Sequence, residues 1–198
     1  MTAAAQNTMR IHYQGGTTLD ISLDEIDSVT FVTTTPDDPQ PQASLTGSWL
    51  WGKAEAGYYE LLTLNADRTY TGLDTYFEYG FDTHTYGSYS LRGSLLTLFS
   101  YGFGYQRVLR WFVVGLTANA LDVVTQMGSF TYYRLQPDDI TLQLGSTLAP
   151  TDDGCYIFAD GTTLAITDGS IRALAAGTTY VQYQQPDGTI VAYKVVVQ

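Results

Sequence analysis

The stretch YYELLTLNADRTYTGLDTYF, residues 58–77, decides the fold of this chain. It holds two β-like runs, 58–64 and 69–77, with the turn-forming residues Asn65-Ala66-Asp67 between them. Neither run shows the spacing of apolar residues that a helix requires. Asn and Asp favour the tight turn that would join two neighbouring strands. The stretch therefore predicts a pair of antiparallel strands.

Similar runs continue on both sides of this pair. Short connections between sequential strands predict an antiparallel meander, and eight strands of this length can close into a barrel without exposed edges. In the run 107–115 each face mixes apolar residues with one Arg, Arg107 or Arg110, so the alternation leaves the inward-facing set open. The six further runs lie at 45–52, 84–91, 94–101, 107–115, 120–126 and 130–135.

The flanking segments have a different composition. Alternating runs at 8–14 and 17–23 around Gly15-Gly16 predict a β-hairpin, followed by a helical turn at 24–28 and a strand at 29–32. The Pro-rich segment 33–42 predicts a linker. After residue 137 aromatic residues are sparse, and six short runs predict a small β-sandwich: 140–144, 155–158, 162–167, 170–174, 178–184 and 189–197. We therefore expect three parts, 1–42, 43–136 and 137–198.

Charge and composition exclude several classes of function. The chain has 198 residues, a net charge of −11 and only two Lys, which argues against nucleic acid or an anionic membrane as partner. No apolar run approaches the roughly 20 residues of a membrane span. One Cys excludes an intrachain disulfide, and two His exclude a His-rich metal site. The acidity belongs to the flanks, which carry −5 each, while the barrel segment carries −1.

The first residues bear on the compartment. Ala3-Ala4-Ala5 fits the small-residue pattern that precedes signal-peptide cleavage, with Gln6 as the first mature residue. A plain disordered start fits the same residues. No lipobox Cys is present. We expect an exported protein of the periplasm, outer surface or extracellular space.

Several motifs in the barrel segment resemble bacterial lipocalin-like domains. They are Leu45-Thr-Gly-Ser-Trp49, 59–70, Gly87-Ser-Tyr89 and Thr131-Tyr-Tyr-Arg134. The resemblance implies a Gly-x-Trp opening at Gly47 and Trp49, and an Arg134 that stacks on the indole and plugs one barrel end. The family's usual Gly in the second turn is Arg68 here, which puts the geometry of that turn in question.

The two flanks carry resemblances of their own. The segment 168–181 with its Ala176-Gly177-Thr178 corner, together with 144–145 and 193–197, resembles a bacterial group 2 immunoglobulin-like domain. Such modules imply surface, adhesion or spacer roles. The stretch 9–31 is similar to a short N-terminal element of secreted proteins from anaerobic gut bacteria, which implies no catalytic role.

Signals for catalysis and cofactors are sparse. His12 and His84 lie outside any nucleophile motif, and we expect Cys155 to be a buried, inert thiol. The segment 101–105 has glycines but lacks the Lys and helix of a phosphate loop, and no calcium loop is present. We therefore expect no enzyme, no cofactor and no metal. A glycosidase pair is the remaining catalytic alternative, drawn from Glu55, Glu60, Asp74, Glu78 and Asp82.

Aromatic residues cluster at two predicted connections, 76–81 and 101–105. At a barrel mouth such rings can stack on sugars or enclose an apolar ligand. They can equally cover the barrel end or pack on the neighbouring domain.

We expect a non-catalytic binding protein that takes a small apolar or glycan ligand at this barrel end, with an envelope protein as a further partner. An adhesion or assembly protein with a filled barrel is the alternative. The candidate ligand-binding residues are Tyr76, Phe77, Tyr79, Phe81, Tyr101, Phe103 and Tyr105.

Overall fold

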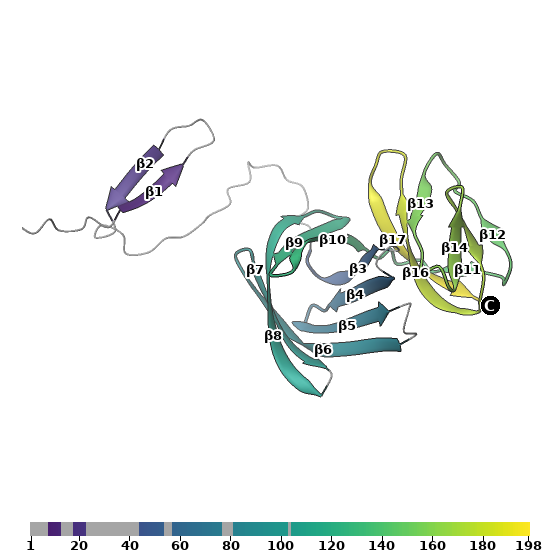
Figure 1. Ribbon diagram of the computed structural model, residues 1–198, viewed down its shortest axis with the longest axis horizontal. Helices are drawn as coiled ribbons and strands as arrows, with labels where there is room; N and C mark the ends of the chain where they lie inside the picture. The colour runs from purple at the N-terminus through teal and green to yellow at the C-terminus, as the bar shows by residue number, and fades with distance from the viewer. Residues whose placement is uncertain (1–7, 13–17, 23–43, 54–56, 77–80, 103) are drawn as a thin grey trace, which may run out of the picture. The chain divides into compact units, whose positions relative to one another are not determined.

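The computed structural model describes residues 8–12, 18–22, 44–53, 57–76, 81–102 and 104–198 (Figure 1). Within these ranges every regular element is a β-strand, so the all-β prediction is confirmed. None of the described segments forms a helix long and apolar enough to cross a membrane. The chain divides into two compact units, Met1–Asp38 and Pro39–Gln198.

The described part of the first unit is a two-stranded antiparallel sheet. Strand β1 (Thr8–His12) pairs antiparallel with β2 (Thr18–Ser22). The Arg10 guanidinium donates two hydrogen bonds of 2.7 Å to the Asp20 carboxylate on the facing strand. The two predicted strands are confirmed. The predicted Gly15-Gly16 turn, the elements at 24–32, the linker 33–42 and the Ala3–Ala5 motif lie outside the described residues.

Eight antiparallel strands of the second unit close into a barrel in the order β10-β3-β4-β5-β6-β7-β8-β9. Each strand follows its predecessor in sequence, and β10 closes the barrel by pairing Tyr133 with Leu50 and Arg134 with Trp49 of β3. The predicted eight-stranded antiparallel barrel is therefore confirmed (Figure 1). The strands are β3 (Gly47–Lys53), β4 (Tyr58–Leu64), β5 (Thr69–Tyr76), β6 (Phe81–Arg92), β7 (Leu95–Gly102), β8 (Tyr105–Leu116), β9 (Ala120–Thr125) and β10 (Gly128–Arg134).

The alternation of each strand sends one set of side chains into the barrel core. In β8 the structure resolves the ambiguity of the sequence: Trp111 is buried, whereas Arg110 and Phe112 are exposed on the outside. Arg107 and Leu109 share the inward face with Trp111. The buried core comprises Trp49, Leu62, Leu64, Tyr70, Tyr89, Leu96, Leu98, Trp111, Leu121, Val123 and Tyr132.

Arg134 closes one end of the barrel. Its guanidinium lies 4.1 Å from the centre of the Trp49 ring, which confirms the predicted stacking. It also donates to the carbonyls of Ala118 (2.6 Å) and Thr46 (2.9 Å) and to that of Ser44. One side chain thus satisfies three carbonyls from two separate loops over the apolar core.

The turn between β4 and β5 forms with Arg68 where a Gly was expected. Arg68 adopts a φ of 70°, the left-handed region that side chains with a Cβ disfavour. The Arg68 amide donates to the Asn65 carbonyl (3.1 Å), and the Arg68 carbonyl accepts from the Tyr89 amide (2.8 Å). The backbone of this turn therefore has the left-handed conformation that usually requires glycine, and Arg68 adopts it despite the steric cost.

The remaining residues form two small sheets that share an apolar core. Strand β11 pairs parallel with β17, and the other pairs are antiparallel. Six of these strands match predicted runs, whereas β12, only two residues long, was missed. One sheet has the order β11 (Ile140–Leu142), β17 (Ile190–Val197), β16 (Gly177–Gln184), β13 (Cys155–Phe158); the other has β12 (Thr147–Leu148), β15 (Ser170–Ala173), β14 (Leu164–Thr167).

A third apolar cluster joins the outside of the barrel to these sheets. Leu50 and Tyr59 from the barrel pack with Phe158 and Ala192 from the sheets, all of them buried. A Cβ built on Gly52 would lie 2.6 Å from the Phe158 ring, so glycine is required for this approach. The barrel and the sheets are therefore joined by a shared apolar cluster as well as by the polypeptide chain.

Candidate functional site

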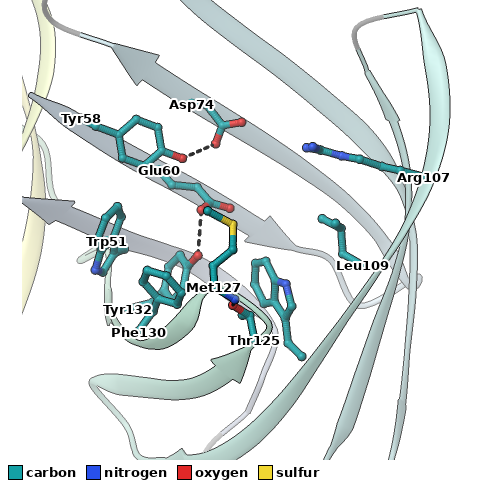
Figure 2. Close-up of a pocket in the computed structure, with 11 residues that line it drawn as sticks. Trp51, Tyr58, Glu60, Asp74, Arg107, Leu109, Thr125, Met127, Phe130 and Tyr132 are labelled. Carbon is teal, nitrogen blue, oxygen red and sulfur yellow. Dashed lines mark hydrogen bonds between the residues drawn. The ribbon is translucent and has the colours of Figure 1, made fainter. Parts of the chain in front are cut away.

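The barrel interior holds a cavity of about 580 Å³. Its lining combines five aromatic rings with two carboxyl groups and one guanidinium (Figure 2), and two of the rings, Trp111 and Tyr132, also belong to the buried core. Ligand pockets in proteins commonly measure about 300–1,000 Å³ and pair apolar walls with a few polar groups. The lining residues are Trp51, Tyr58, Glu60, Asp74, Arg107, Leu109, Trp111, Thr125, Met127, Phe130 and Tyr132.

The cavity lies toward the barrel end opposite Arg134. Trp51 is near the end of β3, Tyr58 begins β4, and Asp74 is near the end of β5. These positions border the connections 54–57 and 77–80, whereas Arg134 contacts the loops that hold Thr46 and Ala118. One end of the barrel is therefore plugged, and the cavity lies at the other.

Two carboxyl groups sit side by side on the cavity wall. Glu60 of β4 is directly opposite Asp74 of β5 in the strand register. Opposed residues of this kind have Cβ atoms about 4.5–5.5 Å apart. The Tyr132 hydroxyl donates to Glu60 Oε2 at 2.8 Å, and the Tyr58 hydroxyl donates to Asp74 Oδ1 at 3.0 Å (Figure 2). Two tyrosines thus orient the carboxyl groups within the cavity.

Burial shifts the acidity of both carboxyl groups. Loss of water, with the neighbouring Asp74 carboxylate as a second cause, raises the pKa of Glu60 to about 7. Burial also raises the pKa of Asp74. The Arg107 guanidinium, which extends into the cavity from β8 (Figure 2), opposes both shifts but does not cancel them. Glu60 is therefore able to take up and release a proton near neutral pH.

The aromatic rings form two contacting groups around these acids. Trp51 packs edge-on to Phe130, with ring centres 5.2 Å apart, and lies 5.4 Å from Tyr58. Trp111 stacks on Tyr132 at 5.7 Å and an interplanar angle of 23°. Contacts between rings hold their faces in fixed positions. The cavity is therefore a preformed pocket with aromatic walls.

No family model, curated protein or solved structure matches this chain. A carboxyl group with a near-neutral pKa beside a second carboxyl group is able to transfer protons, and the same pair is able to bind a cation. Among the described residues, no cluster of three or more His, Cys, Asp or Glu side chains suits a metal ion.

Of the seven residues predicted to bind ligand, the structure describes the backbone of four, Tyr76, Phe81, Tyr101 and Tyr105, and these lie near this end of the barrel. Tyr76 ends β5 and pairs with Phe81 at the start of β6, beside the cavity end. Tyr101 and Tyr105 border the next connection, and both rings are largely exposed. Neither lines the cavity; the Tyr101 ring instead contacts Tyr86, with centres 5.3 Å apart. Phe77, Tyr79 and Phe103 lie outside the described residues.

The other chemical candidates are placed as follows. His84 is exposed on β6, and the backbone of His12 lies on β1, as predicted for strand residues. Cys155 begins β13 as predicted, but its expected burial is wrong: it is partly exposed because the strand starts there beside the 151–154 bend. Of the five carboxyl groups considered for a glycosidase pair, the cavity brings together Glu60 and Asp74 and leaves Asp82 exposed; Glu55 and Glu78 lie outside the described residues.

The predicted ligand-binding residues do not include those that line this cavity. The usable signal was alternation: Glu60 shares the inward face of β4 with Leu62 and Leu64, which are buried. An acid that continues an inward apolar series is buried at a cost unless it has a role or a partner. Arg107 continues the series of Leu109 and Trp111 in the same way.

Proposed function

We propose that this protein is a non-catalytic binding protein, exported to the cell envelope or beyond, whose barrel binds one small, largely apolar or glycan ligand. The observation that carries the proposal is the cavity of about 580 Å³ with aromatic walls and a few polar groups. Its volume suits one small molecule rather than a protein segment. The lipocalin-like motifs favour ligand uptake, and the immunoglobulin-like motifs favour a spacer or surface role for the C-terminal sheets.

A filled cavity tests the proposal. Leu109 lines the cavity on β8, whereas its neighbour Val108 is exposed on the outer face. Lipids and oligosaccharides are screened for binding to the wild-type protein, with tryptophan fluorescence and thermal shift as the readouts. We expect each ligand found in this way to bind Val108→Trp but not Leu109→Trp. Equal binding by both variants would place the ligand elsewhere. Absence of any ligand for the wild-type protein would count against the proposal.

An assembly role is the second candidate, and an exposed apolar surface favours it. Tyr86, Phe99 and Phe112 are 55%, 50% and 54% exposed, and they lie on neighbouring strands of one outer barrel face. Large exposed apolar patches often mark interaction sites. Analytical ultracentrifugation of the wild type and of Phe99→Ser tests this role: self-association that the substitution abolishes would support it, and a monomer at all concentrations would oppose self-assembly.

A glycan hydrolase is a catalytic variant of ligand binding in the same cavity. It is favoured only by the pairing of Glu60, near-neutral in pKa, with Asp74. Release of chromophore from aryl glycosides, abolished by Glu60→Gln, would establish it. Binding of glycans without turnover would leave the non-catalytic function in place.

A further inference from the structure

Resting on the proposed ligand binding in the barrel, we propose that the ligand carries a cationic ammonium group, which binds beside Glu60 and Asp74 among the aromatic rings. The ligand is then a protonated amine or a quaternary ammonium compound with an apolar body. Its cationic end enters the cavity, and the apolar body contacts Leu109, Met127 and the rings. Three features of the cavity support this class of ligand.

The first feature is the capacity of the paired carboxyl groups to accept hydrogen bonds. Each accepts one tyrosine hydroxyl, from Tyr132 to Glu60 and from Tyr58 to Asp74. An ionised carboxyl group has room for about four donors. An ammonium group offers up to three donors and no acceptor, so it complements this wall. A ligand carboxylate would instead face two groups of its own charge.

The second feature is the arrangement of the rings. Trp51, Tyr58 and Phe130 form one contacting group, and Trp111 with Tyr132 forms another, all lining the cavity that holds the acids. The faces of aromatic rings carry negative electrostatic potential and attract cations, Trp most strongly. Both Trp residues of the lining therefore favour the same ligand charge as the carboxyl groups do.

The third feature is the charge balance of the lining. Among the described residues, the lining holds two carboxyl groups and one guanidinium, that of Arg107, and no lysine. With both acids ionised, the described part of the lining carries one excess negative charge, which a single ligand cation neutralises. Burial is the main cause of the raised pKa of Glu60 and of Asp74, and the Arg107 guanidinium offsets it only in part.

A series of ligands that differ only in the head group tests the inference. Octylammonium, 1-octanol and octanoate share one apolar chain, and Trp51 and Trp111 report binding by fluorescence. We expect octylammonium to bind at least about tenfold more tightly than octanol, and octanoate to bind most weakly. Octanol or octanoate binding as tightly as the amine would overturn the inference while leaving the proposed function intact. No binding by any of the three would count against both.

A substitution that removes the charge of a carboxyl group but keeps its shape tests whether that group causes the preference for octylammonium over octanol. Asp74→Asn keeps an oxygen for Tyr58 but removes the charge, and we expect it to reduce the advantage of octylammonium over octanol by roughly tenfold. Asp122→Asn is the matched control, because Asp122 lies on β9, bonds Thr131 and does not line the cavity. A loss of preference in both variants would point to the net charge of the protein rather than to the cavity.

The protonation of Glu60 supplies a second readout. Its titration is influenced by Asp74 from β5, Arg107 from β8 and Tyr132 from β10. A bound cation favours the ionised acid, so binding should release a proton and strengthen between about pH 6 and pH 8. Calorimetry in buffers of different ionisation enthalpy measures this release. Octylammonium affinity that is flat with pH, with no proton released, would contradict contact between the cation and Glu60.

Discussion

Arg68 shows how a single residue can carry strain that the fold imposes. Its φ of 70° belongs to a turn in which the backbone bonds to Asn65 and Tyr89, so the geometry persists whatever the side chain. A residue with a Cβ loses roughly 1–2 kcal/mol in this region relative to glycine. The guanidinium lies 6.0 Å from the Tyr89 ring centre, a contact worth about 0.5 kcal/mol at an exposed site.

We therefore expect Arg68→Gly to be more stable than Arg68→Ala, with a free energy of unfolding about 1 kcal/mol higher. Both variants lack the contact with Tyr89, and only the alanine retains the strain, so their difference isolates the backbone. Urea unfolding followed by tryptophan fluorescence measures it. An alanine variant as stable as the glycine variant would mean that the turn relaxes to another conformation.

Glu60 gives a pH dependence of stability whose sign follows from its raised pKa. Its pKa is about 7 in the folded protein, against the usual 4.5. Below about pH 4.5 the acid is protonated in both states, so its ionisation does not affect the free energy of unfolding. As pH rises toward 7 the unfolded chain ionises first, and stability is lost.

We expect Glu60→Gln, which keeps an acceptor for Tyr132, to gain stability relative to the wild type over this range. The gain should be small near about pH 4, approach roughly 3 kcal/mol above about pH 7 and stay level beyond it. Denaturant unfolding at a series of pH values measures the difference. A constant difference across the range would show that Glu60 titrates normally in the folded protein.

Single residues were the least predictable level of this molecule. Alternation alone could not tell whether Arg107 or Arg110 faces inward, because each shares its strand face with apolar neighbours. Closure of the barrel decides it, by setting Trp111 against the core. Glu60 and Asp74 were separated from other acids only when strand pairing placed them opposite each other. Such pairings depend on contacts that no local pattern contains.

The positions of strands were far more predictable than the roles of single residues, because turn residues in the local sequence mark where each strand ends. All eight barrel strands lie at the predicted runs, since turn residues such as Asn65 and Asp67 end them locally. The two-residue strand β12 was missed because it is too short to alternate. The parallel pairing of β11 with β17 was also missed, since it joins strands nearly 50 residues apart.

Arg134 allows a test at the level of the barrel end. A lysine can neither stack as a plane on Trp49 nor reach three carbonyls at once. We expect Arg134→Lys to lower the free energy of unfolding by about 2 kcal/mol, since a hydrogen bond to a charged group contributes about 1.5–3 kcal/mol. Arg110→Lys, on the exposed outer face, is the matched control and should change stability little. Equal effects would mean that the plug contributes nothing specific.

At the scale of the whole molecule, the contact between the barrel and the C-terminal sheets links the stability of the two parts. Phe158 is buried against Tyr59 and Leu50, and its ring occupies the space left by Gly52. Backbone bonds continue across the boundary, from the Leu135 amide to the Ser48 carbonyl and from the Gln136 amide to the Ala192 carbonyl, both 2.8 Å. A shared core of this kind couples the unfolding of its two sides.

We expect the wild-type protein to unfold in one transition and Phe158→Ala in two. All three Trp residues, Trp49, Trp51 and Trp111, belong to the barrel, so their fluorescence reports the barrel alone, while far-UV circular dichroism reports both parts. The substitution should cost about 3–5 kcal/mol of packing and leave each part with its own core. Ile157→Ala, whose side chain is exposed on the same strand, is the control and should keep the two signals coincident. Coincident curves for Phe158→Ala as well would mean that the backbone connection, rather than the apolar contact, carries the coupling.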